Sequence, residues 1–319
     1  MHYAIIALLT WALASGHVPW PAWPLVSIVI GCSMAGVTFV AHEALHGGVV
    51  RGRTLIRLIG WLGFLPFCIS PQLWMGWHNR VHHNHCGQPG VDPDMYPTIA
   101  EYKAERRARI TADYLGLGRR QLRGLVSLLF GLTGQSVQVL FAAHKTGVLS
   151  GRLQRRAIIE SLAGVAVWAA VASLVGASAF VFVYLLPLIV ANSIVMVFIL
   201  TNHNLSPLSP VNDPLVNSLS VTLPRVLEWL TLDFGFHVEH HLFPVMSARQ
   251  GRVVRQVLRA RFPERYQSLP LPTAIRRLHE TSRVYLDNTT LIDPRSGRTW
   301  PTLTPGTRRE APVAAHAAD

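Results

Sequence analysis

The amino-acid sequence predicts an all-α integral membrane protein with about four transmembrane helices in two hairpins, interfacial helices and a histidine-rich cap. Three observations predict this fold class. Half of the 319 residues are hydrophobic and only 14% are charged, which lies outside the usual range of soluble proteins. Long apolar segments occur in pairs around short turns. Eight of the fifteen histidines fall in three short clusters that follow apolar segments.

The net charge of +12 is distributed as in a membrane protein. No Lys or Arg precedes Arg51, and basic residues then lie between the apolar segments and in the C-terminal third. Because cytoplasmic loops carry the excess of Lys and Arg, the basic side and the histidine clusters are predicted to be cytoplasmic, with a bacterial inner membrane as the expected location. The sequence shows no nucleic-acid-binding motif, and we expect no nucleic-acid partner.

The first hairpin is predicted from residues 3–22 and 25–46, with Trp20 and Trp23 as interfacial aromatic residues in the turn. The second segment is long enough to cross a bilayer core of about 30 Å, and the basic run RGRTLIR follows it. A secretory signal peptide is an alternative for the first segment because ALAS resembles a cleavage site. The positively charged n-region of such a peptide is missing.

The middle of the chain is predicted to stay at the membrane surface. Residues 58–74 are short and interrupted by prolines, so we expect a re-entrant or interfacial segment. Residues 125–143 are apolar but contain Gln135, Ser136 and Gln138, and we expect an interfacial or loosely embedded helix.

The second hairpin is predicted from residues 161–175 and 179–201. It has no charged residue inside and ends next to His203, so each hairpin delivers a histidine to the basic side of the bilayer. Residues 1–286 are expected to form the membrane domain. Residues 287–319 are rich in Thr, Pro, Gly and Arg, and a mobile tail is predicted there.

A basic segment precedes this tail. Its four arginines lie at helical spacing with aliphatic residues between them: Arg249, Arg252, Arg255 and Arg259. Two interpretations stay open, a solvated helix face or a surface that docks on anionic headgroups or on an acidic carrier.

The candidate metal ligands are histidines at helical spacing. They are His42 and His46 in HEALH, His78, His82 and His83 in HNRVHH, His237, His240 and His241 in HVEHH, and His203 in TNHN. Two histidines four residues apart share one helix face and can bind one ion. A metal such as zinc takes about four ligands, so eight or nine imidazoles predict two metal ions. Imidazole suits zinc, copper, iron and nickel, and the residues alone leave the metal open.

Acidic residues near the clusters are candidates to accept the free imidazole N–H and fix the tautomer of a ligand. They are Glu43, Asp92, Asp94, Asp233 and Glu239, and a plain surface or capping role is an equal alternative for each. His85 and Cys86 lie beside the second cluster, and we expect neither to be a ligand. The three cysteines form no disulfide framework.

HEALH also matches the H-E-x-x-H pattern of zinc metalloproteases, in which the Glu is the general base. This alternative uses His42, His46 and one further ligand, and it leaves the other clustered histidines without a role. A metal transporter is another alternative, but it would predict ionisable groups inside the spans, and the second hairpin has none.

The histidine motifs resemble those of the membrane fatty acid desaturase family. The resemblance is carried by HEALHG, WHNRVHHNHCGQPGVDPD and FHVEHHLFPVM, by their order and by the hairpin between them, and it covers residues 37–246. One departure is visible. The second motif reads HxxxHH, whereas relatives commonly have HxxHH.

The resemblance implies two non-haem iron ions held by these histidines, dioxygen as co-substrate and an acyl chain as substrate. An unactivated methylene C–H is not acidic, so no general base removes its proton at a useful rate. An oxidant formed from dioxygen can abstract hydrogen instead. The predicted activity is therefore that of an acyl desaturase, an oxidoreductase that forms a double bond and reduces dioxygen to water. Hydroxylases, ketolases and acetylenases have similar histidine boxes and stay open as alternatives.

The same reaction needs two electrons from outside. The sequence has no G-x-G-x-x-G motif and no haem-binding or iron–sulfur pattern, so a separate donor is implied, such as a ferredoxin or a small haem protein. The carrier of the acyl chain is left open between a lipid, CoA and a carrier protein.

Overall fold

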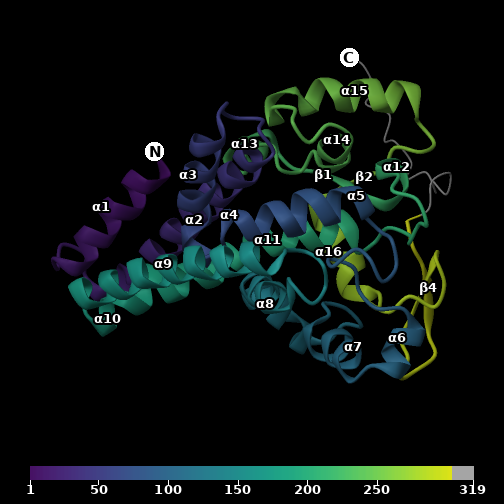
Figure 1. Ribbon diagram of the computed structural model, residues 1–319, viewed down its shortest axis with the longest axis horizontal. Coiled ribbons are helices and arrows are strands. Elements are labelled where there is room, and N and C mark those ends of the chain that lie inside the picture. Colours follow the sequence, from purple (N-terminus) through teal and green to yellow (C-terminus); the bar gives the residue numbers. More distant parts are fainter. Residues whose placement is uncertain (304–319) are drawn as a thin grey trace, which may run out of the picture.

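Four helices in the computed structural model, which describes residues 1–303, are long and apolar enough to cross a membrane. They are Trp20–Leu45, Leu122–Ala142, Gly151–Val175 and Ala177–His203. A bent pair, Arg53–Phe67 and Pro71–His85, adds a broken span or re-entrant loop with a bend of 100°. The predicted all-α membrane fold is confirmed (Figure 1), but the four spans are not the four that the sequence predicted.

The helix in the first predicted span is shorter than predicted. Helix α1 (His2–Ala14) has 13 residues, about 20 Å at 1.5 Å per residue, which is less than the bilayer core of about 30 Å. The chain turns at Gly16, whose φ is +74°. Trp20–Ala22 then forms a 3-10 turn (η1) that continues into α2 (Trp23–Leu45), so this tryptophan opens the second helix.

The segment predicted to be an interfacial or loosely embedded helix, residues 125–143, is long and apolar enough to be a candidate span. It consists of the 3-10 turn η5 (Leu122–Leu125) and helix α8 (Val126–Ala142). Its polar side chains contact protein: Ser136 is buried, and the Oδ1 atom of Asn192 accepts the backbone N–H of Thr133 at 3.2 Å. Phe130 and Phe141 are exposed. Ser136 and Thr133 therefore face protein, whereas Phe141 and Gln138 are exposed.

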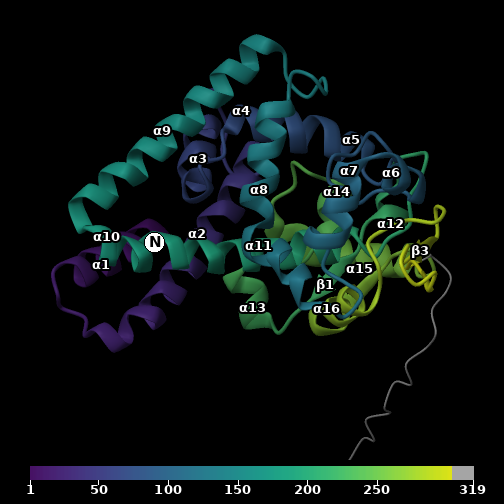
Figure 2. The ribbon, with the colours of Figure 1, turned by 90° about the horizontal axis from the view of Figure 1, so that it is seen from below.

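The second hairpin forms where it was predicted, with a longer first arm. Helix α9 (Gly151–Val175) begins ten residues earlier than expected. The chain reverses at Gly176, whose φ is +82°, and continues as α10 (Ala177–Phe180), the π-helical η6 (Val181–Leu185) and α11 (Leu186–His203). Figure 2 shows α9 meeting α10 at one corner of the molecule, from which α11 runs back.

Helices α2 and α11 pack side by side in the same direction. The Ser27 hydroxyl donates to the Phe182 carbonyl at 2.7 Å, and the Phe39 and Phe198 rings lie 5.8 Å apart further along. The contacts thus advance in step along both helices. Since α2 ends in the HEALH motif and α11 ends at His203, their parallel packing brings these histidines to one end.

The re-entrant segment is built from α3 (Arg53–Phe64), η2 (Leu65–Phe67) and α4 (Pro71–Trp74). At its bend, the Ser70 hydroxyl caps α4 by accepting the backbone N–H groups of Gln72 and Leu73. Ser70 also donates to Glu160 of α9 at 2.6 Å. The bend is followed by the π-helix η3 (Met75–His82) and α5 (His83–His85). This segment returns the second histidine cluster to the end of α2.

The rest of the chain forms a cap of short elements over that end (Figure 1). Its helices are α6 (Ile99–Ala104), α7 (Arg106–Ile110), the π-helical η4 (Thr111–Leu115), α12 (Pro214–Asn217), α13 (Arg225–Leu230), α14 (His237–Leu242), the 3-10 turn η7 (Ala248–Gln250), α15 (Gly251–Arg261) and α16 (Leu271–Glu280). Strand β1 (Ser220–Thr222) pairs in parallel with β2 (Ser268–Pro270). Strand β3 (Thr290–Ile292) pairs antiparallel with β4 (Thr299–Pro301).

The mobile tail predicted from residue 287 is wrong as far as residue 303. These residues contain the β3–β4 hairpin, and Leu291 is buried in a cluster with Leu208 and Tyr285. Alternating apolar residues in TLI and TWP make this pairing possible, although the composition of the segment is that of a loop. Residues 304–319 of the predicted tail lie outside the described residues.

Candidate metal centre

The nine histidines predicted as ligands meet at the shared end of α2 and α11. They come from α2 and its C-cap (His42, His46), η3 and α5 (His78, His82, His83), the last residue of α11 (His203) and α14 (His237, His240, His241). All except His46 are buried. Side chains separated by up to about 200 residues of sequence therefore form one cluster.

Two larger groups of ligand atoms, in each of which the atoms lie within 4.8 Å of one another, are linked by a third group of His78, His82 and Asp94. The first group consists of His42, His46, His78, His83 and His240, and the second of His82, Cys86, His203 and His241. His237 belongs to neither group, but its Nε2 lies 2.6 Å from Nε2 of His203. Two neighbouring groups are the arrangement that two metal ions require.

The π-helix η3 gives His78 two histidine neighbours. The sequence predicted that His78 and His82, at i and i+4, would hold the same ion, and these two residues do form a group with Asp94. Nε2 of His78 also lies 3.2 Å from Nε2 of His83, at i+5. A π-helix has an i→i+5 hydrogen-bond pattern and arises from one extra residue in a helix. The extra residue in HxxxHH is accommodated in this way.

Imidazole nitrogens in the cluster face one another. Nε2 of His42 lies 3.0 Å from Nε2 of His78, and Nε2 of His83 lies 3.3 Å from Nε2 of His240. Within residues 1–303, Nε2 of His82 and both nitrogens of His241 are buried without a hydrogen-bond partner. A buried polar atom without a hydrogen-bond partner lowers the stability of the fold by about 1–3 kcal/mol. Converging lone pairs of this kind fit a bound cation.

The protonation state of the imidazoles also fits a metal. Burial lowers the pKa of His46, His237, His240 and His241 well below its ordinary value, and neighbouring imidazoles lower it further. These side chains are therefore neutral near pH 7. The neutral imidazole is the form that donates a lone pair to a metal.

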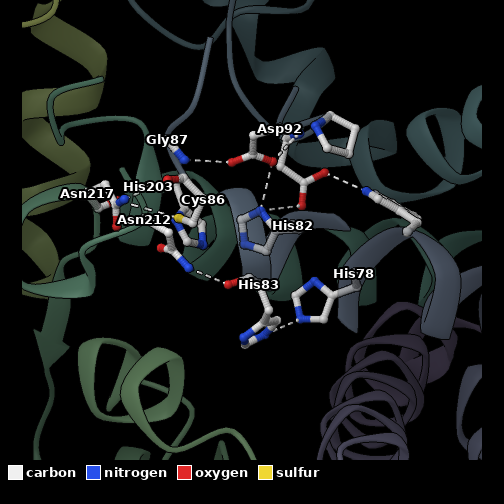
Figure 3. A network of polar contacts seen from close by, with 12 residues as sticks. His78, His82, His83, Cys86, Gly87, Asp92, His203, Asn212 and Asn217 are labelled. Atoms are coloured by element: carbon white, nitrogen blue, oxygen red, sulfur yellow. Dashed lines mark hydrogen bonds and ion pairs between the residues drawn. The ribbon is translucent and has the colours of Figure 1, made fainter. Parts of the chain in front are cut away.

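Three of the five predicted acidic residues contact a ligand imidazole. Oδ1 of Asp92 lies 2.9 Å from Nδ1 of His82, and Oδ2 of Asp94 lies 3.4 Å from the same atom. Figure 3 shows Asp92 beside His82, with His78 and His83 turned toward one another. Oε1 of Glu43 lies 3.2 Å from Nδ1 of His42. Each carboxylate can hold an Nδ1–H and leave Nε2 free for a metal.

The other two acids contact no histidine among residues 1–303. Asp233 lies 4.0 Å from Arg252 at the surface. Glu239 accepts hydrogen bonds from Ser220 at 2.5 Å, Tyr266 at 2.6 Å and Arg255 at 3.1 Å. Glu239 thus joins α14 to β1 and α15 and fixes the position of the third histidine motif.

The arginine helix differs from both interpretations of the sequence at one position. Arg255 is buried, and its guanidinium lies 3.8 Å from the centroid of the Phe236 ring. Arg252 pairs with Glu228 at 2.8 Å, whereas Arg249 and Arg259 are exposed. Arg255 is therefore neither a solvated nor a docking residue, but part of the support beneath the third histidine motif.

Cys86 is the residue that sequence reasoning set aside and the structure brings into the cluster. Its Sγ lies 3.5 Å from Nδ1 of His203, and the only signal in the sequence was its position four residues after His82. Burial raises the pKa of the Cys86 thiol well above its ordinary value, so it is not a preformed thiolate ligand. His85 lies apart, with Nδ1 2.9 Å from Oε1 of Gln88.

Aromatic walls close the cluster on the membrane side. The Trp74 ring stacks on His78 with centroids 4.4 Å apart, and the Phe234 ring lies 5.0 Å from His42. A cavity of about 30 Å³ lies between these walls and the imidazoles. It gives the histidine cluster a small, mainly apolar space on its membrane side.

Comparisons with known proteins agree with this centre. A family model described as fatty acid desaturase matches residues 19–270. The sn-1 oleoyl-lipid 12-desaturase of Synechocystis sp. is 25% identical over 258 residues, which are 75% of this chain and 70% of that protein. Dihydrorhizobitoxine desaturase of Bradyrhizobium elkanii is 37% identical over 98 residues, 29% of this chain. Zeaxanthin 4-ketolase of Chlamydomonas reinhardtii is 32% identical over 108 residues, 30% of this chain.

The matches to dihydrorhizobitoxine desaturase and zeaxanthin 4-ketolase are short. They cover 26% and 23% of the lengths of those two proteins. The family match, in contrast, covers most of the chain and contains all three histidine motifs. Together with the apolar helices it identifies an integral membrane oxidoreductase. The chain belongs to the fatty acid desaturase family.

Proposed function

We propose that this protein is a dioxygen-dependent fatty acyl desaturase with two non-haem irons. The observation that carries the proposal is that mostly buried imidazoles from four segments of the chain form two larger, adjacent groups. The balanced reaction is R–CH₂–CH₂–R′ + O₂ + 2 e⁻ + 2 H⁺ → R–CH=CH–R′ + 2 H₂O. When bound, the irons supply the activation of dioxygen and the abstraction of hydrogen from an unactivated carbon.

The residues of the chain have distinct tasks in this proposal. The histidines of the first group would hold one iron, and His82, His203 and His241 of the second group would hold the other. Asp92 and Glu43 hold the Nδ1–H of His82 and His42, which directs both Nε2 atoms inward. Trp74, Phe39 and Phe234 line the small cavity and exclude water from the reacting carbons, so that no competing reaction with water takes place.

The proposed substrate is an acyl chain of a membrane lipid, on a bacterial inner membrane with the histidines on the cytoplasmic side. Support comes from the 75% of this chain that aligns with an acyl-lipid desaturase. Electrons come from a separate donor, a ferredoxin or a small haem protein. A relative with 29% identity over 98 residues is named sn-1 acyl-lipid omega-3 desaturase (ferredoxin).

A second candidate function is hydroxylation or ketone formation at the same centre. Its support is the local similarity to carotenoid ketolases. The desaturase match extends over more than twice as much of the chain as these matches do, which favours desaturation. The zinc protease is not supported, because a single zinc would leave the second group without a role.

The test combines metal analysis with product analysis. The purified protein is expected to contain two irons per chain, and a host that lacks desaturases is expected to accumulate new double bonds, located by mass spectrometry. His240→Ala should abolish the product and lower bound iron, whereas His144→Ala, which changes an exposed histidine outside the cluster, should change neither. A hydroxylated or ketonic product would favour the second candidate, and a single zinc without iron would overturn the proposal.

A further inference from the structure

A larger cavity lies beside the metal centre, between α8, α11 and the segment 89–98. Its volume is about 610 Å³, within the range of about 300–1,000 Å³ that holds drug-sized ligands. Apolar side chains of α8 and α11 line one part, including Phe130, Val139 and Met196. Polar residues such as Thr98 and Glu101 of the cap line another part. We call this cavity the chamber, and its walls suit an amphipathic molecule.

Only side chains separate the chamber from the small cavity at the histidines. Asp94, Gln135 and Ile199 line both spaces. Nε2 of Gln135 donates to Oδ1 of Asp94 at 2.7 Å, and Nε1 of Trp77 donates to the same oxygen at 2.7 Å. These polar groups satisfy one another, and Ile199 supplies the apolar side. The three residues form a partition that is one side chain thick.

Gly134, next to Gln135 on α8, opens the chamber at this point. A Cβ atom at Gly134 would meet no atom within 4 Å, whereas one at Gly131 would lie 2.6 Å from Cε of Met196. Gly131 is thus required by the packing of α8 on α11, and Gly134 is not. Glycine inside a helix costs about 1 kcal/mol relative to alanine. The gap at Gly134 therefore adds free width to the chamber at a cost in helix stability.

We propose that the chamber binds the substrate, with Gly134 providing the width for an acyl chain and Gln135 fixing which carbons pass the partition. The inference rests on the proposed function and adds the place where the substrate lies. The polar end of the substrate lies toward Thr98 and Glu101. Its apolar chain follows α8 and α11 and passes along Ile199 to the metals.

Photolabelling tests the location without requiring turnover. The full-length protein in lipid nanodiscs is exposed to stearic acid that carries a diazirine in the middle of its chain, and labelled peptides are mapped by mass spectrometry. We expect labels in segment 89–98, which belongs to the cap. Gly134→Leu should lower this labelling by about tenfold, because the added side chain fills the space. Val137→Leu is the matched control: Val137 is an exposed residue of α8 outside the chamber lining and should label as the wild type does.

Equal labelling of segment 89–98 in Gly134→Leu and the wild type would overturn the inference, as would labels confined to the exposed face of α8. Iron content is measured in every variant, and a normal value shows that the metal centre is intact. The proposed function fails by a different result, namely that the wild type with two irons and a donor makes no unsaturated product.

The role of Gln135 has its own test. Gln135→Ala removes part of the partition and is expected to broaden the distribution of double-bond positions at normal iron content. Val137→Ala is the control, since Val137 is an exposed residue of α8 that lines neither cavity. An unchanged product distribution in Gln135→Ala contradicts the proposed role, provided that iron is retained.

Discussion

Nε2 of His203 lies 2.6 Å from Nε2 of His237, although 34 residues separate them in the sequence. His203 belongs to none of the three histidine motifs and is the last residue of a membrane-spanning helix. Its contact with α14 joins the end of the second hairpin to the cap. The metal centre is therefore shared between the membrane helices and the cap.

His203→Ala is expected to remove the metal of the second group and to leave the first group occupied, because His203 contributes to the second group alone. The number of iron ions per chain should fall from two toward one, and elemental mass spectrometry measures it. Full iron content in a folded His203→Ala protein would show that His203 is not a ligand. His144→Ala serves as the control.

Asp92→Asn is expected to weaken metal binding at the second group. The carboxylate fixes the tautomer of His82 at 2.9 Å, and loss of such a partner typically costs about 10–100-fold in metal affinity. Competition with a chelator measures this affinity. Asp233→Asn changes an acid without a histidine contact among the described residues and should bind metal as the wild type does. Equal chelator sensitivity of both variants would contradict the role of Asp92.

Arg255→Leu is expected to destabilise the protein by about 3–5 kcal/mol, because it leaves the buried carboxylate of Glu239 without its charged partner. Thermal unfolding in detergent should show a lower midpoint, and release of iron should accompany it. Arg261→Leu, at an exposed position of the same helix, should change the stability by less than about 0.5 kcal/mol. Similar midpoints for both variants would exclude a supporting role for the Arg255–Glu239 pair.

Cys86→Ser is expected to retain both metals. The burial that raises the pKa of the thiol disfavours the thiolate that a metal would bind. The optical spectrum of the iron-loaded wild type should therefore lack a thiolate-to-iron charge-transfer band. Such a band in the wild type, absent from Cys86→Ser, would make Cys86 a ligand.

The histidine motifs and the second hairpin could be predicted from the sequence because each produces a pattern among residues that are close together in the chain. HEALH and HVEHH show helical spacing, and the stretch from residue 161 to 201 is apolar on both sides of a glycine turn. The same local reasoning failed for residues 3–22, since a 3-10 turn at Trp20–Ala22 continues into α2. It also missed the candidate span at 125–143, because Thr133, Gln135 and Ser136 of α8 contact protein rather than water.

The sequence by itself determined that imidazoles would cluster at one membrane face, because apolar length fixes the spans and helical spacing fixes the faces. Only the tertiary structure decided how the ligands divide. The π-helix placed His78 beside His83, the cap placed His237 against His203, and a buried arginine 16 residues beyond Glu239 came to support the third motif. Such pairings depend on distances between helices that are far apart in the chain, and no local pattern encodes them.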